Sequence, residues 1–115
     1  MQNYDKAYEL ARQMRSSETY QAYLKARDAA FENQMNKEIY KKYVEISRTV
    51  TALQMSGQQV DEKLQAEFNQ LVGVLSLNGD MMAFLLAEHK LNQMIGDVFK
   101  IIGDAVEINL DFLKD

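Results

Sequence analysis

The chain contains no proline and only five glycines in 115 residues. Proline lacks the backbone N–H that helices and sheets use, and glycine is the residue that most readily adopts tight turns. A sequence almost without these two residues has few places for the sharp reversals that an all-β fold needs at every hairpin. It therefore predicts long helices, and 115 residues are enough for a single domain over 1–115 with its own core.

Apolar residues recur at helical spacing along the chain. The clearest run is spaced 4, 3, 4, 3 and consists of Ile39, Tyr43, Ile46, Val50 and Leu53. A second run repeats the spacing 4, 3, 4 with Leu64, Phe68, Leu71 and Leu75. Such spacing is typical of the seam of a coiled-coil-like helix pair, and the short link between the two runs predicts an antiparallel hairpin. A further stripe predicts an N-terminal helix and contains Tyr4, Ala7, Tyr8, Ala11 and Met14.

Polar residues and glycine indicate where these helices begin and end. The candidate N-caps, whose side chains can accept a free amide N–H of the first turn, are Asn3, Ser16 or Ser17, and Asp61. Gly57 tolerates the positive φ that commonly ends a helix, and residues 33–36 mark another bend. Gly79 is expected to end one helix and Asp80 to cap the next. The sequence thus predicts an all-α antiparallel bundle of about five helices with coiled-coil-like seams.

The last third of the chain, from Met81, is more apolar than one helical stripe requires. An apolar surface broader than a single stripe implies burial on more than one side, and one helical hairpin cannot cover it. We expect a homo-oligomer, a dimer or higher, and a face for self-association or a protein partner. That face comprises Leu91, Met94, Ile95, Val98, Phe99 and Ile102. Residues 107–115 alternate apolar with acidic residues and are expected to add a short helix at most.

The net charge of −4 is concentrated at the C-terminal end, where residues 80–115 hold three lysines and seven acidic residues. Binding to nucleic acid through phosphates needs a concentrated basic face, so we expect none. The middle of the chain holds four basic residues, Lys37, Lys41, Lys42 and Arg48. They are spaced too widely to form a concentrated basic face, so the expectation stands. The N-terminus lacks the apolar core of a secretory signal, and the longest uncharged run, residues 68–79, is shorter than the ~20 residues of a membrane span. A cytoplasmic protein without membrane contact is the expectation.

Few residues are suited to catalysis or metal binding. The chain has no cysteine, which excludes thiolate chemistry and thiolate ligands for a metal or an iron–sulfur cluster. His89 is the only histidine, and with Glu88 it is the sole pair from which a general base could be assembled. Gly96 and Gly103 lie seven residues apart on one helical face, where they favour either close helix packing or a helix end. We expect no catalytic residue, no metal and no cofactor.

Four segments give the chain a resemblance to a known family. They are YDKAYEL at 4–10, SSETY at 16–20, LQMSG at 53–57 and AEHKLNQMI at 87–95. With these segments the chain resembles the YlbF/YmcA/YheA family of small helical bacterial proteins, and most closely its YheA-like branch. The resemblance spans nearly the whole chain and implies an all-helical, self-associating protein without enzyme activity.

Relatives in that family regulate competence, biofilm formation and sporulation by joining partner proteins and steering an RNA-cleaving enzyme. Those relatives are associated with iron–sulfur clusters held by cysteines, and no such residue can be carried over to a chain without cysteine. The leading hypothesis is therefore a non-catalytic, homo-oligomeric scaffold or adaptor. The alternatives are a nucleic-acid-associated regulator of RNA processing, competence or biofilm formation and, last, an enzyme using His89 and Glu88.

Overall fold

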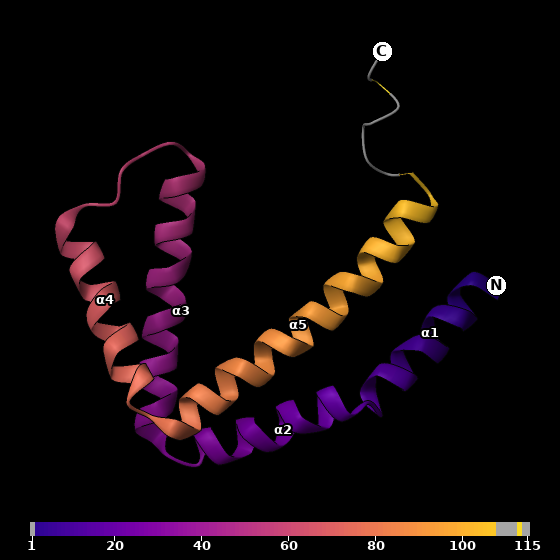
Figure 1. Ribbon diagram of the computed structural model, residues 1–115, viewed down its shortest axis with the longest axis horizontal. Helices are drawn as coiled ribbons and strands as arrows, with labels where there is room; N and C mark the ends of the chain where they lie inside the picture. The colour runs from indigo at the N-terminus through magenta and orange to yellow at the C-terminus, as the bar shows by residue number, and fades with distance from the viewer. Residues whose placement is uncertain (1, 108–112, 114–115) are drawn as a thin grey trace. The chain divides into compact units, whose positions relative to one another are not determined.

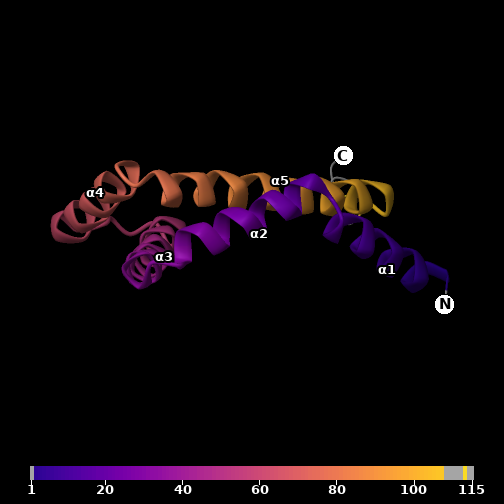
Figure 2. The same ribbon diagram turned by 90° about the horizontal axis from the view of Figure 1, so that it is seen from below.

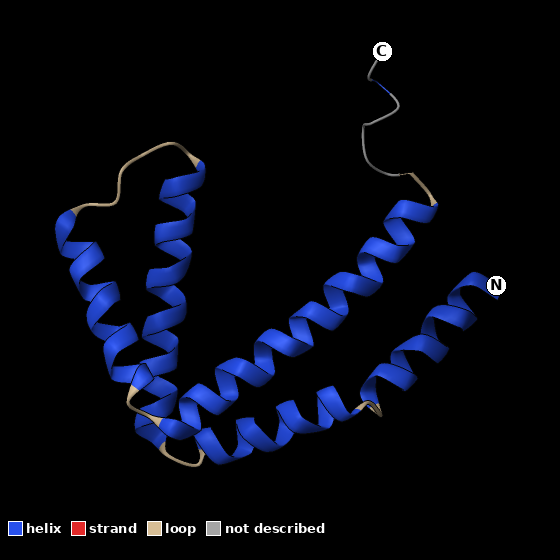
Figure 3. Ribbon diagram, in the orientation of Figure 1, coloured by secondary structure: helices blue, strands red, loops and turns tan. Residues whose placement is uncertain are grey.

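The computed structural model describes residues 2–107 and 113, and all regular structure in that part of the chain is helical (Figures 1 and 3). Five helices follow one another in sequence, and they are α1 (Gln2–Arg15), α2 (Glu18–Phe31), α3 (Gln34–Met55), α4 (Glu62–Ser76) and α5 (Gly79–Ala105). This confirms the predicted all-α fold of about five helices. The short helix considered for residues 107–115 falls almost entirely outside the described residues.

Three helices are capped by side chains at the predicted breaks. The Ser17 hydroxyl accepts a hydrogen bond from the backbone N–H of Tyr20, 3.1 Å away, at the start of α2. A carboxylate oxygen of Asp61 accepts from the N–H of Leu64 at 2.7 Å at the start of α4. Asn33, at the first residue of the predicted bend, caps α3 in the same way. Each bond satisfies an amide that would otherwise lack a partner in the first turn.

Two other predicted helix boundaries are wrong. Asn3 lies inside α1, which already begins at Gln2, because no helix-breaking residue stands ahead of it. Asp80 lies in the first turn of α5, and Gly79 opens that helix instead of ending α4. The cap is Asn78, whose amide oxygen accepts a hydrogen bond from the N–H of Met81 at 3.1 Å. Asn78 is favoured over Asp80 because its amide can also donate a hydrogen bond, as described below.

Gly57 ends α3 as predicted, with φ of +77°. The N–H of Gly57 donates to the carbonyl of Gln54 at 3.2 Å, and the N–H of Gln58 donates to the carbonyl of Leu53 at 2.9 Å. This pair of bonds is the Schellman motif, which requires a left-handed residue at the position of Gly57. The turn allows α4 to return alongside α3, so the predicted antiparallel hairpin is confirmed (Figure 1).

The chain divides into two compact units, which we describe separately. Unit 1 consists of Met1–Tyr23 and Leu86–Asp115, and unit 2 consists of Leu24–Leu85. Unit 2 holds every buried large apolar side chain among the described residues. The buried apolar residues of the described chain are Ala30, Ile46, Val50, Leu75, Met81 and Phe84.

The core of unit 2 is built from the predicted seams and from an aromatic cluster. Tyr43 of α3 stacks on Phe68 of α4, with ring centroids 6.1 Å apart. Phe84 of α5 meets Phe31 of α2 at 4.8 Å and Tyr40 of α3 at 5.2 Å, both edge to face. Edge-to-face geometry places the positive ring edge against a negative ring face. Phe84 therefore joins three helices in a single contact cluster.

A polar network crosses the same core. Asn36 is only 5% exposed, and its side-chain N–H donates to the carbonyl of Ala30 at 2.7 Å. Its side-chain oxygen accepts a hydrogen bond from the amide of Asn78 at 2.9 Å. Since Asn78 also caps α5, this chain of bonds links the end of α2, the start of α3 and the start of α5. Asn36 belongs to the bend predicted for residues 33–36, and the sequence pattern does not predict its burial in the core.

Unit 1 contrasts with unit 2 because it has no apolar core among the described residues. No side chain of α1 is buried. The part of α5 that belongs to unit 1, which Figure 2 shows continuing as one unbroken helix, buries only Gly103. Gly103 therefore does not end α5, which runs on to Ala105. The helix ends where Glu107 takes a positive φ of 52°.

Candidate functional site

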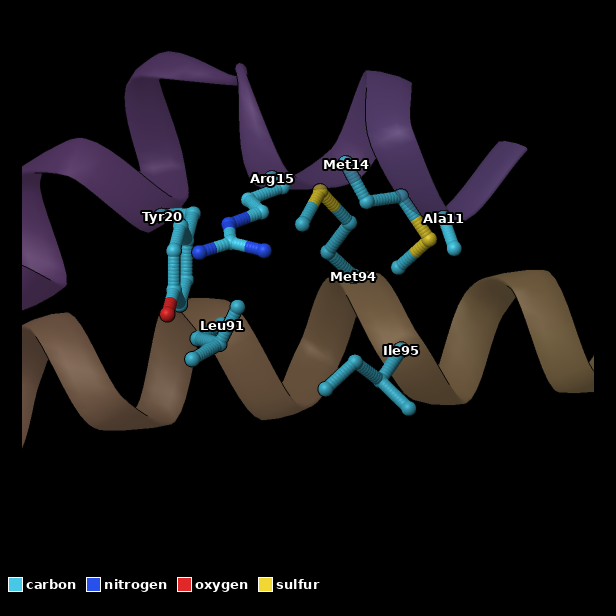
Figure 4. A pocket seen from close by; sticks show the side chains of 7 residues that line it. All are labelled: Ala11, Met14, Arg15, Tyr20, Leu91, Met94 and Ile95. Atoms are coloured by element: carbon cyan, nitrogen blue, oxygen red, sulfur yellow. The ribbon is translucent and has the colours of Figure 1, made fainter. Parts of the chain in front are cut away.

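The most distinctive surface feature of unit 1 is an apolar groove of about 360 Å³. Side chains from α1, the start of α2 and the middle of α5 point into it (Figure 4). The lining residues are Ala11, Met14, Arg15, Tyr20, Leu91, Met94 and Ile95. Arg15 is the only charged residue among them, so the groove is suited to apolar contact more than to acid–base chemistry.

The structure divides the predicted interaction face of α5 into two parts. Leu91, Met94 and Val98 are half-buried, and the first two line the groove. The other three predicted residues are exposed, with 49% for Ile95, 68% for Phe99 and 55% for Ile102. About half of this predicted face therefore contacts solvent.

The exposed part continues to the end of the helix. Val106 is 61% exposed, and its N–H still donates to the carbonyl of Ile102 at 3.1 Å, so it keeps the helical register. Val106 follows Ile95, Phe99 and Ile102 in the chain, and the intervals between these four residues repeat the 4, 3, 4 pattern of a helix seam. We call these four residues, Ile95, Phe99, Ile102 and Val106, the α5 ridge.

Other apolar side chains of unit 1 are exposed as well. On α1, Tyr4 is 62% and Tyr8 is 67% exposed, although both belong to the apolar stripe of the sequence pattern. On α5, Ile101 is 69% exposed. The helix α1 is therefore amphipathic by its sequence pattern, but the two tyrosines of its apolar stripe contact solvent.

The comparison with known proteins places the chain in a family. A family described as control of competence regulator ComK, YlbF/YmcA, matches residues 3–107. The chain belongs to the YlbF/YmcA family. This confirms the resemblance inferred from the four sequence segments.

Curated relatives of this YlbF/YmcA protein are UPF0342 proteins. One from Symbiobacterium thermophilum is 30% identical, and the match covers 96% of this chain and 99% of that protein. Another from Halothermothrix orenii is 26% identical over 93% of this chain and 91% of its own length. A solved structure of a DUF964 protein from Bacillus stearothermophilus matches with a TM-score of 0.76 over 93% of this chain and 94% of that one. At 16% identity, that structure supports the fold alone. None of these names denotes an enzyme.

The residues considered for catalysis do not gather into a site in this YlbF/YmcA protein. His89 is exposed and Glu88 is half-buried, and neighbouring residues of a helix diverge by about 100°. Within the described residues, no group of three or more histidines and carboxylates lies close enough to hold a metal ion. The ion pair nearest to the ridge joins Lys100 to Asp104 at 2.8 Å. The hydrogen bond and charge of Asp104 raise the pKa of Lys100 above its ordinary value.

The structure also shows the surroundings of Gly96 and of three methionines of α5. A Cβ added to Gly96 would meet nothing within 4 Å, so no close packing within the chain requires this glycine. Met81 is completely buried in the core of unit 2. Met94 lines the groove of unit 1, and Met82 is 45% exposed.

The four basic residues of α3 do not form one surface. Lys37, Lys41 and Arg48 are exposed and lie within about 40° of one another around the helix. Lys42 points elsewhere and borders a small hollow beside Glu67 of α4. Among the described helices, none is by itself long and apolar enough to cross a membrane, and only α4 and α5 taken together as a bent pair meet that criterion.

Proposed function

We propose that this chain is a non-catalytic regulatory protein that acts as a homo-oligomeric helical adaptor. Unit 2 is the folded anchor, and unit 1 supplies the surface for association. The observation that carries the proposal is the lack of any buried large apolar side chain among the described residues of unit 1. Apolar surface stays unfavourably hydrated until another polypeptide covers it.

The amount of uncovered apolar surface supports this assignment. Unit 1 exposes about half or more of several large apolar residues, and seven of them are Tyr4, Tyr8, Ile95, Phe99, Ile101, Ile102 and Val106. At about 200 Å² for a large side chain, their exposed fractions correspond to roughly 850 Å². Unit 2 also exposes single apolar residues such as Leu77, but a different set of buried apolar residues forms its core.

The regulatory part of the proposal rests on the family. Its description refers to control of a competence regulator, and the relatives carry no name that denotes an enzyme. A protein that regulates without catalysis acts by binding, and binding needs an accessible complementary surface. The groove and the α5 ridge supply one in this chain.

Sedimentation velocity and light scattering on the purified chain test the proposal. The expected species has at least twice the 13.3 kDa mass of one chain, and it dissociates on dilution. A hydrophobic dye should bind more strongly to the dissociated protein than to the assembly, because association covers the apolar surface. A compact monomer at every concentration that binds no such dye contradicts the proposal.

A second candidate, a nucleic-acid-associated regulator, is favoured by one observation. Lys37, Lys41 and Arg48 share one exposed side of α3. Titration of a labelled RNA at two salt concentrations tests it, because phosphate contacts make affinity fall steeply with salt. Saturable, salt-sensitive binding that the triple variant to glutamine loses supports this candidate. Absence of binding at low salt leaves the adaptor as the sole proposal.

A further inference from the structure

The spacing and the side-chain sizes of the α5 ridge indicate which polypeptide covers it. We propose that the α5 ridge packs antiparallel against the same ridge of a second copy of the chain. The twofold axis of that pair passes midway between Phe99 and Ile102. The inference rests on the proposed function, since it states how the homo-oligomer is built.

The spacing of the ridge fits an antiparallel copy. Its intervals of 4, 3 and 4 residues read the same in both directions along the helix. Turning a second helix end to end therefore places Ile95 opposite Val106 and Phe99 opposite Ile102 of the copy. All four side chains of each helix meet an apolar partner, as a self-complementary twofold interface requires.

Side-chain sizes favour this direction over a parallel pair. In a parallel pair in register, Phe99 would face Phe99 and Val106 would face Val106. The two largest side chains would then crowd one level of the interface, and the two smallest would leave another level underfilled. In the antiparallel pair, each larger residue faces a smaller one, which keeps the seam evenly filled. The macrodipoles of the two helices are also opposed only in the antiparallel arrangement.

The flank of the ridge that lies away from the groove offers an uncharged approach for a second copy. On the side of the ridge away from the groove the nearest helix positions include Asn92 and Gly96, which are uncharged. A side chain at Gly96 would meet open space, so the neighbouring helix has room there. The lysine nearest the ridge, Lys100, is engaged by Asp104.

The area agrees with an interface that the ridge nucleates and the rest of unit 1 extends. The exposed fractions of the four ridge residues correspond to roughly 450 Å² per chain, at about 200 Å² for a large side chain. Two copies then bury roughly 900 Å², at the weak end of specific interfaces. Adding Tyr4 and Tyr8 brings the pair to roughly 1,450 Å², within the range of standard interfaces.

Cysteine cross-linking tests the pairing directly, because the chain has no cysteine of its own. The double variant Ile95→Cys/Val106→Cys should form a covalent dimer under mild oxidation, and neither single variant should do so. The matched control is Leu86→Cys/Asp97→Cys, which has the same 11-residue spacing on the opposite side of α5 and should stay monomeric. Self-cross-linking of single cysteines at 95, 102 and 106 indicates a parallel pair and overturns the inference. Equal cross-linking of the control pair overturns it too.

A pair of charge substitutions provides a second, equilibrium readout. Ile102→Asp should raise the dissociation constant by at least about 100-fold, because each dimer would bury two unpaired carboxylates. Leu86→Asp, at a site of nearly equal exposure (57% against 55%), should change it by less than about threefold. Circular dichroism checks that both variants remain helical.

The two proposals fail in distinguishable ways. A wild-type chain that is monomeric in sedimentation contradicts the adaptor and the pairing together. A wild-type oligomer that resists cross-linking at 95 and 106 and tolerates Ile102→Asp leaves the adaptor standing and overturns the α5 pairing.

Discussion

Replacing Asn36 with alanine removes the centre of the polar network in unit 2. The side chain is 5% exposed and makes two hydrogen bonds, one to the carbonyl of Ala30 at 2.7 Å and one from the amide of Asn78 at 2.9 Å. Ala30 is completely buried, so water cannot easily replace the lost donor. The cost therefore exceeds that of an exposed hydrogen bond.

The expected loss follows from these two bonds. Each contributes about 0.5–1.5 kcal/mol net, and a buried acceptor left without its partner adds about 1–3 kcal/mol. Together they predict that Asn36→Ala lowers the free energy of unfolding by about 2–6 kcal/mol. With an m-value of roughly 1.5 kcal/mol/M, the urea midpoint should fall by about 1–4 M.

Urea unfolding followed by far-ultraviolet circular dichroism measures this loss. All variants are compared at one protein concentration, because association contributes to the apparent stability. Gln34→Ala is the matched control: it lies two residues away in the first turn of α3, is exposed, and should change the free energy of unfolding by less than about 0.5 kcal/mol. If Asn36→Ala costs no more than this control, the network does not stabilise unit 2 and the reasoning is refuted.

Three further substitutions test local features of the helices. Gly57→Ala should lower the free energy of unfolding by about 1–2 kcal/mol, because Gly57 has a φ of +77° that a Cβ disfavours; an unchanged urea midpoint would contradict this. Gly96→Ala should raise it by about 0.5–1 kcal/mol, since the added methyl meets nothing within 4 Å and alanine is the better helix former; a loss of stability would show that something packs closely on this position. Glu107→Gly should raise it by up to about 1 kcal/mol by relieving the left-handed φ of 52° at the end of α5, and a thermal melt that shifts downward would refute that interpretation.

Much of the local structure could be predicted because its causes lie within a few residues of one another. Ser17 and Asp61 cap the helices that follow them because a short polar side chain reaches the amides of the next turn. Gly57 ends α3 because the adjacent turn needs a positive φ. The hairpin of α3 and α4 follows from two seams of matching spacing, and Tyr43 and Phe68 meet across it.

The error at the start of α5 and the missed burial of Asn36 come from contacts between distant residues. Asp80 and Asn78 are both competent caps by local chemistry, and only the contact with Asn36, 42 residues earlier, selects Asn78. By its local sequence, Asn36 resembles an ordinary turn residue. Its place in the core depends on hydrogen bonds with Ala30 of α2 and with Asn78 at the start of α5. The edge-to-face contacts of Phe84 with Phe31 and Tyr40 likewise have no signature in the sequence.

The candidate site shows the same division. The sequence alone determined that α5 is apolar on more than one stripe, because composition and helical period are properties of the chain itself. Only the tertiary structure decided which of those residues are covered, with Met81 and Phe84 buried in unit 2 and Phe99 and Ile102 left 68% and 55% exposed. The physical reason is that burial depends on which other segments of the chain pack on a surface. Phe31 of α2 and Tyr40 of α3 contact Phe84 in the first turns of α5, and no comparable set of described residues encloses the ridge.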